Sequence, residues 1–369
     1  MTDRLRRRLR QVGSFVLAAG RLALALYGVN LNAMLEAFWQ ADWRWLLPLV
    51  GLVLISNLFR AWRWQILIEA LPTTPDFDAL DEEQPTPQNT LEASFSSIMI
   101  GYMVNYVAPR MGEVARTANL SARSSYRFSS LFGTVVSERI FDTAVLGLAL
   151  LSAVVLLFDQ LAVLQEQFLV PAWGTLASLP IGGLLGGGAA VLLVTAALWV
   201  YVRRSFSRTD STLSRYWSET VKPAVVSFKE GMMTLLRSPR RGAILLSTVG
   251  MWTGYLLMSY VPFRMLDLAA PYGIGLVDAW ILMAIGALGL LVPTPGGIGS
   301  YHYITREALV HFYGVPAETA LTYAVLAHGA QFFFYILSGG VALLYQGTGL
   351  DVLYPSDRPD PSAVEPSQT

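Results

Sequence analysis

Long apolar runs limit this chain to one class of fold. A run of roughly 17 to 25 apolar residues is long enough to cross the hydrocarbon core of a bilayer as an α-helix. Such runs occupy residues 12–29, 45–68, 128–157, 180–202, 243–262 and 318–346. Charged residues make up only 14% of the chain, against about 25% in a soluble protein. We therefore expect an all-α integral membrane protein with about six full spans.

The first of these runs differs from the others because Arg21 interrupts the segment "VGSFVLAAGRLALALYG". A single arginine near the centre of a span is unfavourable in lipid. For residues 12–29 an amphipathic helix in the membrane interface, or the core of a signal peptide, is therefore the alternative to a full span.

Two further apolar stretches, residues 93–121 and 275–312, contain helix breakers at Pro109 and in the segment "PTPGGIG". The basic N-terminus and the basic segment 203–241 are both assigned to the cytoplasm by the positive-inside rule. An even number of crossings must separate them, and the apolar runs between them already provide it. Each broken stretch is therefore predicted to be a re-entrant helical hairpin, folded at Pro109 and at "PTPGG", that enters and leaves on one side.

The order of these elements divides the chain near residue 170 into halves of the same plan, about 1–170 and 171–350. Each half has two spans, a hairpin and one more span, so the second half is predicted to be inverted relative to the first. Residues 1–350 are expected to form a single membrane-embedded domain. Residues 351–369 are expected to be a disordered tail, and both termini are predicted to be cytoplasmic.

The hairpin tips are candidates for an anion site. Non-helical backbone at membrane depth must face a cavity or other protein, because lipid cannot satisfy its polar groups. The helices that follow Pro109 and Gly299 would direct their free N–H groups and positive dipole ends toward the tips. With Arg110 close by, this arrangement suits a phosphate or a carboxylate.

A second group of charges lies in the segment "SERIFD", within the apolar run 128–157. Glu138 and Asp142 share a helical face, and Arg139 projects away from it. Each ionised group in a membrane helix costs about 2.5 to 3.5 kcal/mol unless it is paired or hydrated. Two interpretations remain open and can coexist: an internal network of salt bridges, for example Glu113 with Arg139, or a polar cavity wall that binds a headgroup or moves a proton.

The remaining polar residues of the apolar runs have simpler interpretations. Arg60 and Arg63 in "NLFRAWRW" are predicted to snorkel to the interface beside two tryptophans, with headgroup contact as the alternative. His302 and His328 are predicted to be buried and hydrogen-bonded, with a proton relay as the alternative. The chain has no cysteine and no metal-ligand spacing of histidines, so we expect no metal and no cofactor.

Together these motifs resemble a known family. The segments "GYMVNYVAPRMGEVARTANL", "SERIFD", "RAWRW" and "PTPGGIGSYHYITREAL" are similar to those of the flippase-like family built on the membrane half of the lysyl-phosphatidylglycerol synthases, and they cover nearly the whole chain. The resemblance implies a domain that moves an aminoacylated or otherwise modified phospholipid, or an isoprenoid-linked glycolipid, between leaflets. The matching positions are Asn105, Pro109, Arg110, Gly112, Glu113, Arg116, Glu138, Arg139, Asp142, Pro293, Pro295, Gly296, Gly297 and Gly299.

The chain departs from the family pattern in two places. The synthases carry a soluble aminoacyl-transferring domain after the membrane part, whereas here only a short tail follows the last apolar run, so we expect no synthase activity and no enzyme. Many members have an acidic residue after the glycine-rich tip, where this chain has "SYHY". His302 and Glu307 are the candidates to replace it.

We expect a lipid translocase of the bacterial inner membrane that moves an anionic, aminoacylated or isoprenoid-linked phospholipid. The substrate would be a membrane phospholipid or a polyprenyl-phosphate lipid, bound by the matching residues and His302, and a lipid-modifying enzyme is the expected partner protein. The alternative is a membrane scaffold that presents a lipid to such an enzyme without moving it. A membrane-embedded enzyme is a third class, but no nucleophile–base pair supports it.

Overall fold

A computed structural model describes residues 22–71, 90–124, 126–157, 238–292 and 294–347, together with isolated positions at 16, 19, 20, 226, 233 and 235. Throughout the part described, the regular structure is helical, and no strand occurs in it. The elements are α2 (Leu31–Gln40), η1 (Trp43–Trp45), α3 (Leu46–Glu69), α4 (Leu91–Val107), α5 (Gly112–Ser121), α6 (Phe128–Leu156), α12 (Arg241–Met265), α13 (Ala269–Tyr272), α14 (Leu276–Leu291), η6 (Pro295–Gly297), α15 (Ser300–Tyr313) and α16 (Ala317–Tyr345).

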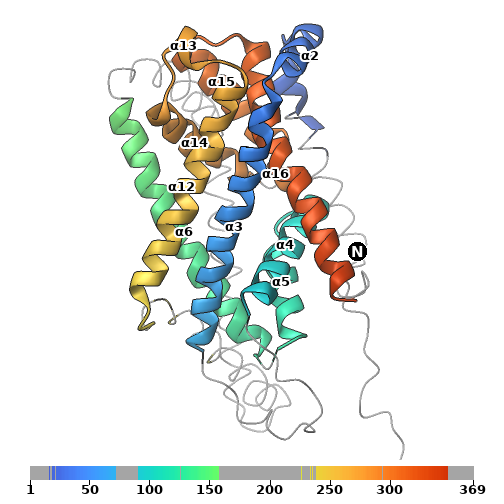
Figure 1. The fold of residues 1–369 in the computed structure, drawn as a ribbon, viewed down its shortest axis with the longest axis vertical. Coiled ribbons are helices and arrows are strands. Elements are labelled where there is room, and N and C mark those ends of the chain that lie inside the picture. The colour runs from blue at the N-terminus through green and yellow to red at the C-terminus, as the bar shows by residue number, and fades with distance from the viewer. Residues whose placement is uncertain are drawn as a thin grey trace, which may run out of the picture.

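Within the described ranges, four helices are long and apolar enough to cross a membrane: α3, α6, α12 and α16. They run along the length of the molecule and confirm the apolar helices predicted at 45–68, 128–157, 243–262 and 318–346 (Figure 1). Of the predicted span 12–29, residues 22–26 are helical. The predicted span 180–202, the boundary near residue 170 and the predicted tail 351–369 lie outside the described residues.

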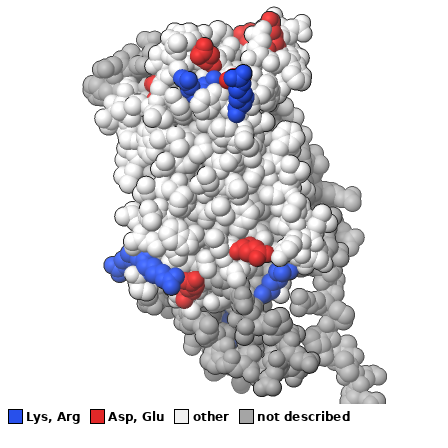
Figure 2. All heavy atoms as spheres, in the orientation of Figure 1, with Lys and Arg blue, Asp and Glu red and all other residues white. Residues whose placement is uncertain are grey.

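The outer surface carries the apolar belt that a bilayer requires. Leu148 and Leu151 of α6, Leu245 of α12 and Leu337 of α16 are each more than half exposed. Figure 2 shows the charged side chains of one face gathered toward the upper and lower ends, with an uncharged zone between them. A large apolar surface of this kind marks contact with a membrane or with another protein, and the length of the apolar helices favours the membrane.

Each hairpin starts and finishes at one end of the molecule. At the lower end, Asn119 at the close of α5 donates to the side chain of Gln346 after α16 (2.8 Å), and Arg240 pairs with Glu69 (2.5 Å). In Figure 1 the pair α4 and α5 occupies the lower half, and the pair α14 and α15 occupies the upper half. The helices α4 and α14 have 17 and 16 residues, fewer than the ~20 of a full span.

The first hairpin turns where the sequence predicts, at residues 108–111. Arg110 takes a left-handed backbone conformation (φ 65°), and the Asn105 side chain closes the turn by accepting from the Gly112 N–H (2.7 Å). The two helices then pack so closely that a Cβ on Gly101 would lie 2.7 Å from the carbonyl oxygen of Gly112. Proline, a positive φ and paired glycines together produce a tight helix–turn–helix.

The second hairpin turns between Val292 and Gly299, as predicted at "PTPGG". Its backbone has positive φ at Gly296 (56°), Gly297 (80°) and Gly299 (83°), a conformation that glycine adopts without steric cost. Pro293 of this motif is outside the described residues. Both stretches are therefore folded-back helix pairs, and their re-entrant position in a bilayer remains a prediction.

The contacts between elements follow a symmetric scheme. The helix α3 packs on α12; α4 packs on α5 and α16, while α14 packs on α15 and α6. Exchanging α3 with α12, α4 with α14, α5 with α15 and α6 with α16 maps this set of contacts onto itself. Two repeats of one plan would produce such a scheme. The packing of the helices is therefore compatible with the predicted relation between the two halves.

The short surface helix α2, upstream of α3, is not predicted by the apolar runs of the sequence. The Asn30 side chain caps it by accepting from the Asn32 and Ala33 N–H groups, and Leu31, Leu35 and Trp39 are exposed along it. It packs on the upper end of α16, where Thr322 donates to the Met34 carbonyl (3.2 Å). At 10 residues, the segment is too short for the apolar-run criterion to detect.

Candidate functional site

A cavity of about 480 Å³ lies where the two hairpin turns meet. The turn element η6 contacts α4, and a Cβ on Gly296 would overlap the ring of Tyr106. From the other turn, the Arg110 guanidinium donates to the Leu291 carbonyl at the end of α14 (2.6 Å). The cavity is thus formed by two breaks in helical structure that are far apart in the sequence.

One wall of the cavity is charged. Arg60 of α3 reaches Asp142 of α6 (3.3 Å) and donates to the hydroxyl of Tyr255 (2.9 Å). Beside them, Arg139 of α6 pairs with Glu113 of α5 (3.1 Å), which confirms the salt bridge that the sequence analysis named. All of these residues line the cavity, so both signs of charge are available to a bound molecule.

Behind this wall lies a buried network centred on Glu138, whose side chain has no exposed surface. Its carboxylate meets Arg60 (2.5 Å), Arg63 (3.3 Å) and Arg116 (3.3 Å). Arg63 also pairs with Asp142 (2.7 Å). Because the network joins α3, α5 and α6, it fixes the first hairpin to two long helices.

Positive charge exceeds negative charge in this region. The wall and the network together contain Arg60, Arg63, Arg116 and Arg139 against Glu113, Glu138 and Asp142. Arg110 adds another guanidinium at the turn, and none of the described carboxylates forms an ion pair with it. Such an excess favours an anionic ligand, above all one that arginine can hold by paired hydrogen bonds.

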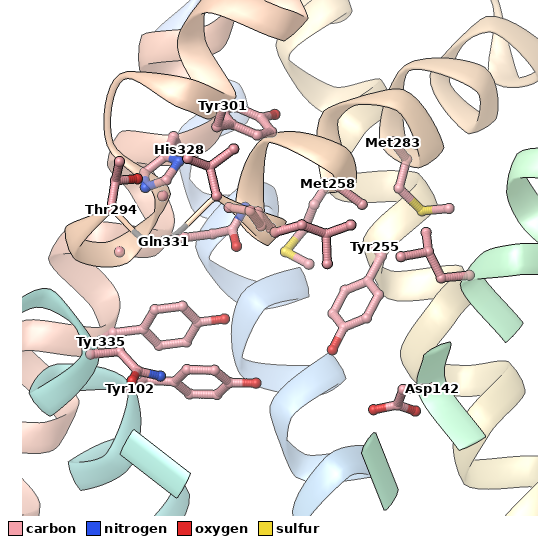
Figure 3. A pocket seen from close by; sticks show the side chains of 18 of the residues that line it. Tyr102, Asp142, Tyr255, Met258, Met283, Thr294, Tyr301, His328, Gln331 and Tyr335 are labelled. Carbon is pink, nitrogen blue, oxygen red and sulfur yellow. The ribbon is translucent and has the colours of Figure 1, made fainter. Parts of the chain in front are cut away.

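The rest of the lining is neutral and largely aromatic. Figure 3 shows the hydroxyls of Tyr102, Tyr255 and Tyr335 directed toward the space between them, to the left of Asp142. The rings of Tyr102 and Tyr335 stack with centroids 4.4 Å apart. On the opposite side lie Thr294 of the second hairpin turn and His328 of α16. These groups can donate hydrogen bonds to a ligand without adding charge.

Half of the residues predicted for the site line the cavity, and the other half support it from behind. The lining residues are Asn105, Arg110, Glu113, Arg139, Asp142, Gly296 and Gly297. Not in the lining are Pro109, Gly112, Arg116, Glu138, Pro295, Gly299 and His302. Their contacts are internal: Arg116 and Glu138 belong to the buried network, and the His302 ring accepts from the Gly299 N–H (3.4 Å).

At each hairpin tip, one of the N–H groups predicted to be free has a partner within the protein. The N–H of Gly112, the first residue of α5, is occupied by the Asn105 side chain. At the start of α15, the Gly299 N–H is occupied by His302. Any anion in the cavity must therefore depend more on arginine side chains than on these two backbone groups. As predicted, His302 is buried; its ring lies 5.1 Å from that of His328, which is also buried.

The interpretation of Arg60 and Arg63 as snorkelling residues is wrong. They are 4% and 1% exposed, and both pair with carboxylates of α6. A signal was present in the sequence, because arginines three apart on one apolar helix match carboxylates four apart on another. The lining tyrosines Tyr102, Tyr255 and Tyr335 were also missed, since single tyrosines in apolar runs are common in membrane helices.

Within the described ranges, no group of three or more histidine, aspartate or glutamate side chains could hold a metal ion.

Long apolar helices that enclose a charged cavity between two folded-back hairpins define a multi-pass membrane protein with a polar interior cavity. The chain belongs to the family described as lysylphosphatidylglycerol synthase TM region, which it matches over residues 11–339. This match confirms the predicted relation. Comparison with curated proteins gave no match, and neither did comparison with solved structures.

Proposed function

We propose that this protein is a lipid translocase of the bacterial inner membrane that moves an anionic, aminoacylated or isoprenoid-linked phospholipid between leaflets. The proposal assigns binding and transport to the cavity, and no covalent chemistry. Membership of a family named for a lipid synthase supports a function in phospholipid metabolism. The basic segments of the sequence support a cytoplasmic position for both termini.

The observation that carries the proposal is the composition of the cavity wall. Arg60, Arg110 and Arg139 supply guanidinium groups for a lipid phosphate, while Glu113 and Asp142 supply carboxylates for a cationic headgroup. A volume of about 480 Å³ accommodates a headgroup, but not two acyl chains in addition. The site therefore suits the polar part of a lipid whose apolar part stays outside.

Binding can be coupled to movement by exchange of ion-pair partners. Arg139 pairs with Glu113 across the boundary between α6 and α5. A phosphate would compete for Arg139, and a cationic headgroup would compete for Glu113. Either exchange loosens the first hairpin from α6, so the ligand would favour a different arrangement of the two elements.

The test is transport in liposomes that contain the purified protein and a fluorescent anionic phospholipid. A membrane-impermeant reductant bleaches the outer leaflet, and later bleaching reports lipid that has crossed. We expect the double substitution Glu113→Gln with Arg139→Gln to lower the transport rate about tenfold. This change corresponds to a transport barrier that is higher by ~1.4 kcal/mol, because both charged partners of the lipid headgroup are removed. Removing both charges together leaves no unpaired charge, so the protein should still fold.

A matched control is the pair Glu69→Gln with Arg240→Gln, which removes one surface salt bridge at the lower end and should leave the rate unchanged. The assay should be run with and without a pH gradient. A wild-type protein that binds the lipid but never transports it would exclude translocation and favour the scaffold.

A further inference from the structure

Some of the residues that line the cavity are exposed. Four residues of its lining are exposed on the outside: Arg110, Thr143, Leu290 and Leu291. They come from the first hairpin turn, from α6 and from the last turn of α14, and α6 and α14 pack on each other. The opening bounded by these residues is called the side mouth below.

The rim of the side mouth is apolar. Val107 and Met111 flank the first turn with exposures of 60% and 48%, and Ile140 of α6 is 58% exposed. Leu290 and Leu291 on the facing side are 52% and 57% exposed. Val107, Met111 and Ile140 lie within three residues of the lining residues Arg110 and Thr143, so an opening here would face a medium that is itself apolar. In a membrane protein that medium is the acyl chains of the bilayer.

Arg110 spans the side mouth from one rim to the other. Its side chain leaves the first turn and donates to the Leu291 carbonyl (2.6 Å). Its backbone is in the left-handed region (φ 65°), which is unfavourable for a residue with a Cβ. Among the described residues, none of the carboxylates pairs with it. A phosphate oxygen would be a stronger partner than a neutral carbonyl, because hydrogen bonds between ionised groups are about twice as strong.

We propose, on the basis of the proposed function, that a two-chain phospholipid enters the cavity sideways through this mouth. Its phosphate replaces the Leu291 carbonyl as the partner of Arg110, and this exchange separates the turn from α14. Its headgroup reaches the charged wall, while its acyl chains stay outside against the apolar rim. Arg110 thus closes the mouth through its hydrogen bond to Leu291 and binds the substrate that opens it.

Photolabelling tests this route without depending on transport. The probe is phosphatidylglycerol with a diazirine in one acyl chain, mixed into phosphatidylethanolamine liposomes that contain the full chain, and the labelled residues are located by mass spectrometry. We expect the label to concentrate on residues 139–146 and 288–291. Leu151 and Leu337, which are 65% and 67% exposed away from the mouth, provide the reference for labelling by bulk lipid.

In Arg110→Ala, labelling at the mouth should fall about tenfold relative to this reference, because a hydrogen bond to a charged group is lost. Arg110→Lys should retain part of it, since it keeps the charge without the paired geometry. The Arg110 side chain is exposed, so both variants should elute and unfold like the wild type. The proposal would be overturned if the amount of label on each residue depended only on its exposure, or if labelling at the mouth were the same in Arg110→Ala as in the wild type.

Transport measured in the same liposomes separates this inference from the proposed function. Labelling at the mouth without transport would support the side mouth and exclude translocation. Transport with labelling at other positions would exclude the side mouth and leave translocation in place.

Discussion

Replacement of Glu138 by glutamine is expected to destabilise the protein by about 3 to 5 kcal/mol, as removal of one partner from a buried ion pair does. Glu138 is the common partner of Arg60, Arg63 and Arg116. Without it, Arg116 has no carboxylate within ion-pair distance among the described residues. The amide cannot offset the cost of keeping guanidinium groups away from water.

The measurement is the thermal unfolding midpoint in detergent, followed by intrinsic tryptophan fluorescence. Glu69→Gln is the control, since Glu69 pairs with Arg240 at a partly exposed site, where a salt bridge contributes about 0 to 1 kcal/mol. Adding Arg116→Met to Glu138→Gln should restore part of the loss by removing the unpaired cation. Equal midpoints for Glu138→Gln and Glu69→Gln would show that the network does not hold the fold together.

Gly296→Ala is expected to have the second largest effect, because it is unfavourable in two ways. The residue has φ 56°, and a left-handed conformation costs a residue with a Cβ roughly 1 to 2 kcal/mol. The new Cβ would also overlap the ring of Tyr106, and forcing a packed side chain aside costs about 1 to 3 kcal/mol. Tyr106 has little freedom to move, since it packs edge-on against Phe332 (4.9 Å).

Gly273→Ala is the matched control for this substitution. Gly273 has a similar φ of 64°, but a Cβ there would meet nothing within 4 Å. The difference between the two unfolding midpoints therefore measures the contact between the hairpin tips alone. If both substitutions cost the same, the contact of Gly296 with Tyr106 contributes nothing to stability.

The long helices could be predicted from the sequence because a helix that crosses lipid must be apolar over about 20 residues, and this property can be seen within a single segment. The apolar runs 45–68 and 318–346 agree with α3 (Leu46–Glu69) and α16 (Ala317–Tyr345) almost to the residue. The turns at Pro109 and Gly296 could also be located, since proline and glycine act locally. No local signal shows that Arg110, and not a glycine, takes the positive φ at the first turn.

The site was harder to predict because it depends on which faces of different helices meet. The sequence places Glu138 and Asp142 on one face of α6, but it does not show that Arg60 and Arg63 of α3 lie opposite. The pairing of Glu113 with Arg139 could be predicted because the first hairpin and the helix that follows it are adjacent in the sequence. Few other charged side chains in these segments could be their partners. Contacts such as Arg110 with Leu291, 181 residues away, depend on the packing of the two halves.

The symmetric packing of the hairpins gives the side mouth a counterpart. The mouth lies at the seam of α6 and α14, and the exchange of halves maps this seam onto that of α16 and α4. The second seam is shut at Gly339, where a Cβ would lie 2.6 Å from that of Met103 and 2.8 Å from the Met99 carbonyl oxygen. If each half adopted the conformation of the other, the seam of α6 and α14 would close and the seam of α16 and α4 would open. If the two halves are also inverted relative to each other, this rearrangement would change the leaflet from which the cavity is accessible.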